Sequence, residues 1–153
     1  HPELPQPMSV EIRPVTQADR PVWGELWTGY LTFYRSELPT SVYDTTFSRF
    51  FDDGPYEPRC RMAWKGKEAV GLVHFLRHRH CWRPEDVIYL QDLYVSEAVR
   101  GTGAGRALIE AVYAEADALG CSTVYWTTAD NNHTARQLYD RVATKTEFIK
   151  YQR

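Results

Sequence analysis

The segment VRGTGAGRALIEAVYAEA, residues 99–116, carries three glycines within five positions, Gly101, Gly103 and Gly105. Arg100 and Arg106 flank them, and the residues that follow repeat with helical spacing. The first N–H groups of a helix have no intrahelical acceptor, and the helix dipole places positive potential there. Glycine lets a phosphate approach that backbone because no Cβ stands in the way. The segment therefore predicts an anion site, although a tight strand–helix turn without a ligand would use the same glycines.

The common nucleotide-binding loops do not fit this spacing. A Walker loop needs Gly-Lys-Ser/Thr, which does not follow here. A Rossmann loop needs a third glycine where this chain has Arg106, and the partner motifs of a kinase glycine loop are missing. The spacing that does fit is R-x-x-G-x-G, read from Arg100 through Gly103 to Gly105.

Two segments together resemble one family. LQDLYVSEAVRGTGAGRALIEAVYAEA followed by VYWTTADNNHTARQLYDRV resembles the GCN5-related N-acetyltransferases (GNAT), over about residues 86–143. The first segment is similar to their acyl-CoA pyrophosphate loop. The second is similar to their N-x-x-A-x-x-L-Y motif, here Asn132, Ala135, Leu138 and Tyr139. NNHTARQLYDRV and the terminal FIKY most resemble the subgroup of histone and polyamine acetyltransferases.

The resemblance implies that acetyl-CoA is the co-substrate and that no metal takes part. The residues expected to contact it are Leu93, Tyr94, Val95, Arg100, Gly101, Thr102, Gly103, Ala104, Gly105, Arg106 and Asn132. The loop would hold the pyrophosphate, and the pantetheine arm would pair with the strand edge at Leu93 to Val95. A backbone N–H near Tyr94 or Val95 would polarise the thioester carbonyl. Asn132 would hydrogen-bond a pantetheine amide.

Tyr139 is the expected general acid. In the family the tyrosine of this motif protonates the departing CoA thiolate. A phenol with a pKa of about 10 is protonated at neutral pH and can donate. The alternative is an ordinary core tyrosine, because Tyr139 shares an apolar helical face with Ala135 and Val142.

Asp92 is the candidate general base. Relatives in the polyamine-acetylating group often carry an acid where this chain has Gln91, and a glutamine cannot take a proton. Asp92 alternates to the opposite face of an ideal strand, but a β-bulge would redirect it. Two alternatives stay open: Asp92 is a structural carboxylate, or water takes the proton without a dedicated base.

The acceptor site is expected against the N-terminal helices, which carry Trp23, Trp27, Tyr30, Phe33 and Tyr34. Tyr30 and Tyr34 lie one helical turn apart and are predicted to contact the acceptor, together with Gln91. This half of the chain is also acidic, which suits a cationic amine, although a solvated charged surface would give the same pattern. The expected acceptor is a small polyamine or an amino-acid-type amine. Transfer to a protein lysine and a non-catalytic acyl-CoA-binding regulatory domain are the alternatives.

The histidines and cysteines do not predict a metal site or a nucleophile. His74, His78, His80 and Cys81 fall within eight residues but lack the paired spacing of a zinc site, so we expect a solvated strand and loop. The alternative is that the RHRH segment lines the cleft and supplies a base. The three cysteines form no C-x-x-C pair, which favours reduced thiols in a cytoplasmic protein.

Periodicity predicts the elements that must position these residues. Strands are expected at 9–16, 86–95, 122–128 and 147–151, a hairpin at 59–79 that turns at 65–67, and helices at 17–38, 44–53 and 131–143. A further helix is expected after the glycines, where Leu108, Val112, Ala116 and Leu119 repeat at helical spacing until Gly120 stops it. The order β-α-α-β-β-β-α-β-α-β predicts the mixed α/β class. The resemblance implies a GNAT-like, mostly antiparallel sheet flanked by helices.

Composition narrows the class of protein. The 153 residues suit one domain, and 43% of them are hydrophobic, which is enough for a core. A net charge of −2 predicts neither nucleic-acid nor membrane-surface binding. No signal peptide is recognised. Residues 1–7 are expected to be a cloning remnant and residues 8–153 a single N-acetyltransferase domain. Because some members of the subgroup dimerise through the last strand, a homodimer is expected.

Overall fold

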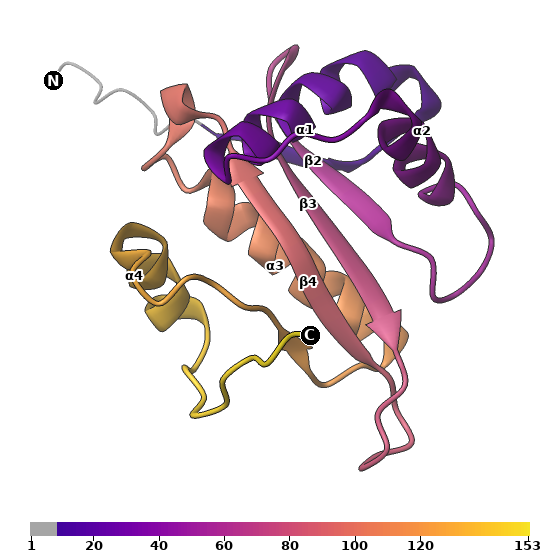
Figure 1. Ribbon diagram of the computed structural model, residues 1–153, viewed down its shortest axis with the longest axis vertical. Coiled ribbons are helices and arrows are strands. Elements are labelled where there is room, and N and C mark those ends of the chain that lie inside the picture. The colour runs from indigo at the N-terminus through magenta and orange to yellow at the C-terminus, as the bar shows by residue number, and fades with distance from the viewer. Residues whose placement is uncertain (1–8) are drawn as a thin grey trace, which may run out of the picture.

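The computed structural model describes residues 9–153 and contains a five-stranded sheet with helices on both faces (Figure 1). The predicted tail, residues 1–7, lies outside the described residues. In chain order the elements are β1 (Glu11–Pro14), η1 (Gln17–Asp19), α1 (Arg20–Phe33), α2 (Thr40–Arg49), β2 (Arg59–Lys65), β3 (Glu68–His78), β4 (Val87–Val95), η2 (Glu97–Val99), α3 (Ala104–Leu119), β5 (Val124–Tyr125) and α4 (His133–Val142). None of the helices within residues 9–153 is both long and apolar enough to cross a membrane.

The sheet runs in the order β1-β2-β3-β4-β5. The first three pairs are antiparallel, and β4 pairs with β5 in parallel. The predicted hairpin is confirmed, since β2 and β3 meet at Lys65 and Glu68 around a turn in which Gly66 has a φ of 59°. The predicted class, a mixed α/β fold with a mostly antiparallel sheet, is therefore confirmed.

Two hydrophobic cores lie on opposite faces of the sheet. In Figure 1, α1 and α2 cover one face of the strands and α3 crosses behind the other. The α3 core includes Val73, Phe75, Ile88, Leu90, Leu108 and Val112. The core under α1 and α2 includes Trp23, Trp27, Phe47, Phe50, Met62 and Leu72. The long strands β3 and β4 supply residues to both cores, so they divide the molecule into two sides.

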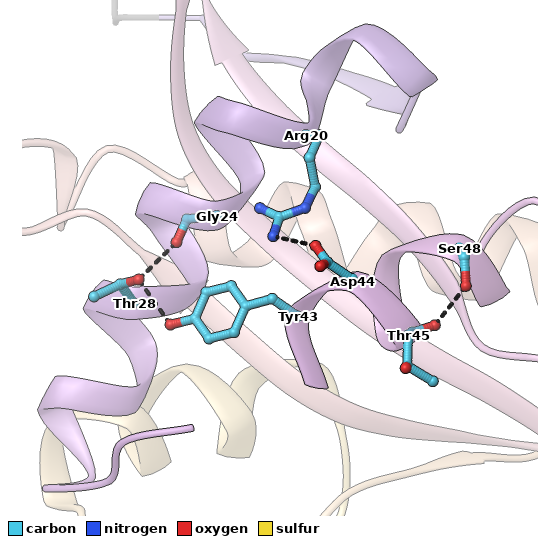
Figure 2. Close-up of polar contacts among 7 residues, drawn as sticks. All are labelled: Arg20, Gly24, Thr28, Tyr43, Asp44, Thr45 and Ser48. Carbon is cyan, nitrogen blue, oxygen red and sulfur yellow. Dashed lines mark hydrogen bonds and ion pairs between the residues drawn. The ribbon is translucent and has the colours of Figure 1, made fainter. Parts of the chain in front are cut away.

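Polar side chains join α1 to α2 on the first side. Arg20 makes an ion pair with Asp44 at 2.9 Å, and the hydroxyls of Thr28 and Tyr43 lie 2.7 Å apart (Figure 2). The Arg20 guanidinium also lies 5.4 Å from the centre of the Trp23 ring. These contacts fix the helical layer that covers the middle of β3 and β4.

Several predicted boundaries are wrong at the ends of elements. The helix predicted at 17–38 ends at Phe33, because Arg35 takes a left-handed φ of 54°. The helix predicted at 44–53 begins at Thr40, directly after Pro39. The strand predicted at 122–128 is reduced to β5, and residues 147–151 form no strand. Those last residues have no partner strand within the described chain, and Phe148, Ile149 and Tyr151 are exposed.

Candidate active site

The glycine loop forms a sharp entry into α3. Gly101 and Gly103 have φ values of 82° and 90°, a conformation that L residues with side chains rarely adopt. Gly103 caps the helix without any side-chain hydrogen bond to the first turn. The N–H groups of Ala104, Gly105 and Arg106 therefore have no intrahelical acceptor and can receive an anion.

The two arginines of the loop are held differently. The Arg100 side chain turns back toward β4, where Nε donates to the Val95 carbonyl oxygen at 3.3 Å, and its guanidinium lies over the Phe33 ring. Arg106 pairs with Glu110 at 2.9 Å, one turn further along the exposed surface of α3. Thr102 donates its hydroxyl to the Val99 carbonyl oxygen, which steadies the loop. The loop thus offers the free N–H groups at the start of α3 as donors to an anion, and the exposed guanidinium groups of Arg100 and Arg106 lie beside them.

The edge of β4 facing β5 is open along its second half. β5 pairs with β4 only at Ile88 and Tyr89, although β4 continues to Val95. Leu93, Tyr94 and Val95 are half-buried, and on this side no strand of the described chain pairs with them. An extended amide chain could therefore add to this edge as a short strand.

Tyr139 lies on α4, close to the end of α1. Its ring meets Trp126 at 5.4 Å between centroids in an edge-on arrangement. Burial and, second, the Tyr34 phenol raise the pKa of Tyr139 to about 12. Its hydroxyl has no hydrogen-bond partner among the described residues, unlike that of Tyr113, which donates to the Val142 carbonyl oxygen. A half-buried, unpartnered phenol is available as a proton donor.

Asn132 is the N-cap of α4. Its side-chain oxygen accepts from the Ala135 N–H at 3.4 Å. Asn132 therefore has a structural role at the start of the N-x-x-A motif, because its side chain satisfies one of the free N–H groups in the first turn of α4. The side-chain NH2 group remains for another acceptor.

A β-bulge decides where Asp92 points. His74 of β3 pairs with Asp92 of β4, whereas the next residue, Phe75, pairs with Leu90, so Gln91 has no partner. Gln91 is exposed, and the extra residue turns Asp92 toward the α1 side of the sheet. The Asp92 side chain is 11% exposed. The sequence left this orientation open, because alternation alone does not reveal a bulge.

His74 is buried, so the expectation of a solvated segment is wrong for this residue. It is 3% exposed, because it faces the core under α1 and α2. Its Nδ1 lies 2.9 Å from Asp92 Oδ2, and its Nε2 accepts from Trp23 Nε1 at 3.0 Å. Sequence reasoning missed this partnership, although His74 lies within an alternating apolar strand. The described residues contain no group of three side chains that could hold a metal.

Tyr30 of α1 lies next to Asp92 and belongs to a row of packed aromatic side chains. Tyr30 stacks on Trp27 at 4.8 Å and contacts Tyr34 at 4.9 Å between ring centroids. Burial and, second, the Asp92 carboxylate raise the pKa of the Tyr30 phenol. Tyr94 passes close to α1, where a Cβ on Gly29 would lie only 2.6 Å from its hydroxyl oxygen. The structure thus brings the predicted residues Tyr30, Tyr34 and Asp92 together.

The cysteines lie outside this arrangement. All three are free thiols, Cys60 and Cys121 buried and Cys81 exposed. Burial raises the pKa of the Cys60 thiol and of the Cys121 thiol, which disfavours the nucleophilic thiolate.

Comparison with known proteins agrees with this geometry. The family model described as the acetyltransferase (GNAT) family matches residues 23–143. The D-amino-acid N-acetyltransferase HPA3 of Saccharomyces cerevisiae is 38% identical over 151 residues, covering 94% of this chain and 90% of the yeast enzyme.

Solved structures share the fold at lower identity. A transcriptional regulator from Bacillus halodurans C-125 superposes with a TM-score of 0.80 at 22% identity, covering 95% of this chain and 99% of its own. AAC(6')-Iy, solved in complex with the bisubstrate analogue CoA-S-monomethyl-acetylneamine, superposes with a TM-score of 0.81 at 17% identity, covering 95% of this chain and 97% of its own. With the family model spanning both predicted motifs and a curated N-acetyltransferase so similar over its length, the chain belongs to the GNAT family of acetyltransferases.

Proposed function

We propose that this acetyltransferase moves the acetyl group of acetyl-CoA to a small primary amine by direct attack within a ternary complex. One observation carries the proposal: the open edge of β4 has the glycine loop near one end and Asp92 on the strand itself. Tyr139 of α4 lies close enough to Tyr34, which directly follows α1, for that phenol to add to the effect of burial on the pKa of Tyr139. A thioester bound along that edge would meet a base and an acid from the two sides of the sheet.

The co-substrate is proposed to bind through three groups of atoms. The first-turn N–H groups of α3 would hold the pyrophosphate. The β4 edge from Leu93 to Val95 would pair with the pantetheine amides, and the Asn132 NH2 group would donate to one of them. When bound, acetyl-CoA supplies an acyl carbon activated as a thioester. The free N–H near Val95 is suited to stabilising the negative charge that develops on the thioester oxygen.

Two side chains are proposed to move the protons. The Asp92 carboxylate takes a proton from the acceptor ammonium, and the freed amine forms the C–N bond as the C–S bond breaks. Tyr139 gives its proton to the departing thiolate and is later reprotonated from solvent. Because its pKa is about 12, Tyr139 is a neutral donor throughout the ordinary assay range. As the amide forms, its nitrogen loses a second proton to solvent water, and Asp92 later returns its own proton to solvent. The products are an amide, the CoA thiol and one released proton.

The acceptor is proposed to be an amino-acid-type amine or a small polyamine that contacts Tyr30, Tyr34 and Gln91. The name of the yeast relative, a D-amino-acid N-acetyltransferase, supports the amino-acid class. The aromatic rings beside the Asp92 side chain also suit a compact cation.

A homodimer and a cytoplasmic location are proposed as well. The chain after α4 exposes Phe148, Ile149 and Tyr151, and burial against a second copy would remove this apolar area from water. Residues 8–153 are proposed to act as one domain, of which the family model spans 23–143. The three free thiols fit a reducing compartment.

A thiol-release assay tests the proposed function. The protein is mixed with acetyl-CoA and, separately, with D-amino acids, L-amino acids, polyamines and a lysine-containing histone-tail peptide. Amine-dependent thiol release with a free amino acid or a polyamine is expected. Release with the peptide alone would favour a protein-lysine acetyltransferase. CoA binding by calorimetry without release for any amine would favour a regulatory domain.

A further inference from the structure

A buried chain of two hydrogen bonds links three elements of the fold. Trp23 lies on α1, His74 on β3 and Asp92 on β4. Trp23 Nε1 lies 3.0 Å from His74 Nε2, and His74 Nδ1 lies 2.9 Å from Asp92 Oδ2. Trp23 is fully buried and His74 is 3% exposed, so water does not compete for either bond.

The tryptophan determines which nitrogen of His74 carries the proton. An indole N–H only donates, so His74 Nε2 must accept. The single proton of the neutral ring is then on Nδ1 and is donated to the carboxylate of Asp92. A second proton on Nε2 would set two N–H groups against each other in a buried site. Trp23 therefore holds His74 as the neutral Nδ1–H tautomer.

Packing also prevents the imidazole from rotating. The His74 ring lies 4.8 Å from the Trp27 ring and 5.1 Å from the Phe50 ring, between centroids. The bulge at Gln91 brings Asp92 opposite this fixed ring. One oxygen of Asp92 is thus bound to His74, while the carboxylate also faces the Tyr30 phenol.

We propose that His74 is a positioning residue for the reaction and that Trp23 sets its tautomer. In this arrangement the Nδ1–H group holds the Asp92 carboxylate in one orientation, so that its other oxygen can take the amine proton. The inference rests on the proposed role of Asp92 as the base. In a serine hydrolase an aspartate orients a histidine base; here the histidine orients the aspartate.

Nitrogen NMR tests the tautomer without relying on activity. In ¹⁵N-labelled protein, His74 is expected to show a protonated Nδ1 and an unprotonated Nε2 at neutral pH. Trp23→Phe removes the donor and is expected to change this pattern. The control Trp64→Phe, at a half-buried tryptophan of β2 that packs against the same core, is expected to leave it. A wild-type His74 protonated at Nε2, alone or with Nδ1, would overturn the proposal.

Kinetics on the best amine of the assay test the effect on Asp92. Trp23→Phe is expected to lower kcat about 10-fold with little change in KM, by analogy with the residues that orient metal ligands, whose loss costs about 10- to 100-fold. Trp64→Phe, which lies on β2 away from the residues assigned to the site, is expected to stay near the wild-type kcat. In an Asp92→Asn background, Trp23→Phe is expected to add no further loss, because its effect passes through Asp92.

A second pair of variants covers the case in which Trp23→Phe does not fold. His74→Asn keeps an N–H donor at the position of Nδ1, whereas the similarly sized His74→Leu does not, and the former is expected to retain about 10-fold more kcat. Equal losses for the two, or additive losses on Asp92→Asn, would overturn the inference. A wild-type rate for Asp92→Asn alone would instead remove Asp92 as base, while the NMR result would still decide the tautomer.

Discussion

The α1–α2 side of the sheet and the β5–α4 edge hold their functional side chains in opposite ways. On the first side, Asp92 is bound through His74 to the fully buried Trp23. At the second, α4 has no fully buried residue, β5 spans two residues and the Tyr139 hydroxyl has no partner within the described chain.

This difference suggests two kinds of site. The residue proposed to take a proton is fixed before any substrate arrives, which avoids reorganisation during the reaction. The residues proposed to meet acetyl-CoA lie on an edge with free backbone donors and acceptors, which a bound amide chain would complete. Four changes test this contrast, in order of decreasing expected effect.

Asp92→Asn should have the largest effect. The amide keeps the size of the side chain but cannot take a proton, so kcat/KM for the best amine should fall about 10³-fold. Steady-state rates of thiol release measure this fall in kcat/KM. Asp117→Asn, on the exposed end of α3, is the matched control and should stay near wild type. If both variants keep the wild-type rate, the fixed side of the sheet does not contain the base.

Tyr139→Phe should lower kcat by about 10- to 100-fold, with little change in fold, because it removes the proposed proton donor. Its hydroxyl has no partner within the described residues, so the free energy of unfolding at pH 8 should change little. The control is Tyr113→Phe on α3, which removes the hydrogen bond to the Val142 carbonyl oxygen of α4, the helix that carries Tyr139. It should cost about 1 kcal/mol of stability and leave kcat near wild type. If Tyr139→Phe instead lowered the free energy of unfolding and kept the wild-type kcat, Tyr139 would be only a packing residue.

Alkaline pH should destabilise the protein through Tyr139. The folded pKa of about 12 lies above the unfolded value of about 10, so the folded state holds this proton more tightly. The stabilisation is complete below pH 10 and is lost as pH rises toward 12, by at most about 2–3 kcal/mol. Urea unfolding at pH 9 and pH 11.5 should therefore show a smaller loss for Tyr139→Phe than for wild type. Equal losses would mean that this phenol is not shielded from water.

Deletion of residues 147–153 should have the smallest effect on the protomer. The apolar side chains in this segment are exposed, so the free energy of unfolding per protomer should change by less than about 0.5 kcal/mol. Sedimentation should nevertheless show a shift from dimer to monomer. A monomeric full-length protein, or a protomer that unfolds after the deletion, would contradict the proposed role of this segment.

The sequence predicted the parts of the fold that local patterns control. Alternation and turn residues located the β2–β3 hairpin and β4, and the glycines located the start of α3, because Gly101 and Gly103 adopt φ values that other residues avoid. The length of β5 and the state of the C-terminal segment were mispredicted, since both depend on the presence of a pairing strand rather than on local propensity.

The site was predictable only where a motif carried it. The roles of the R-x-x-G-x-G loop and of the tyrosine of α4 came from the resemblance to the GNAT motifs and stay predictions. The loop does lie against α4 and β4, since a Cβ on Gly105 would be 3.4 Å from Leu138 and 3.8 Å from Val95. His74 was assigned to a solvated segment because its two partners, Trp23 and Asp92, are 51 and 18 residues away in the chain. The bulge at Gln91 that joins them is a property of strand register, which sequence alternation does not reveal.

Direct attack in a ternary complex can be tested by one kinetic measurement. Initial rates of thiol release are recorded while acetyl-CoA is varied at several fixed concentrations of the best amine. Double-reciprocal lines that intersect are the predicted result, since both substrates must be bound on the two sides of β4 before the acyl group moves. Parallel lines would indicate an acyl-enzyme intermediate and would contradict the proposed mechanism.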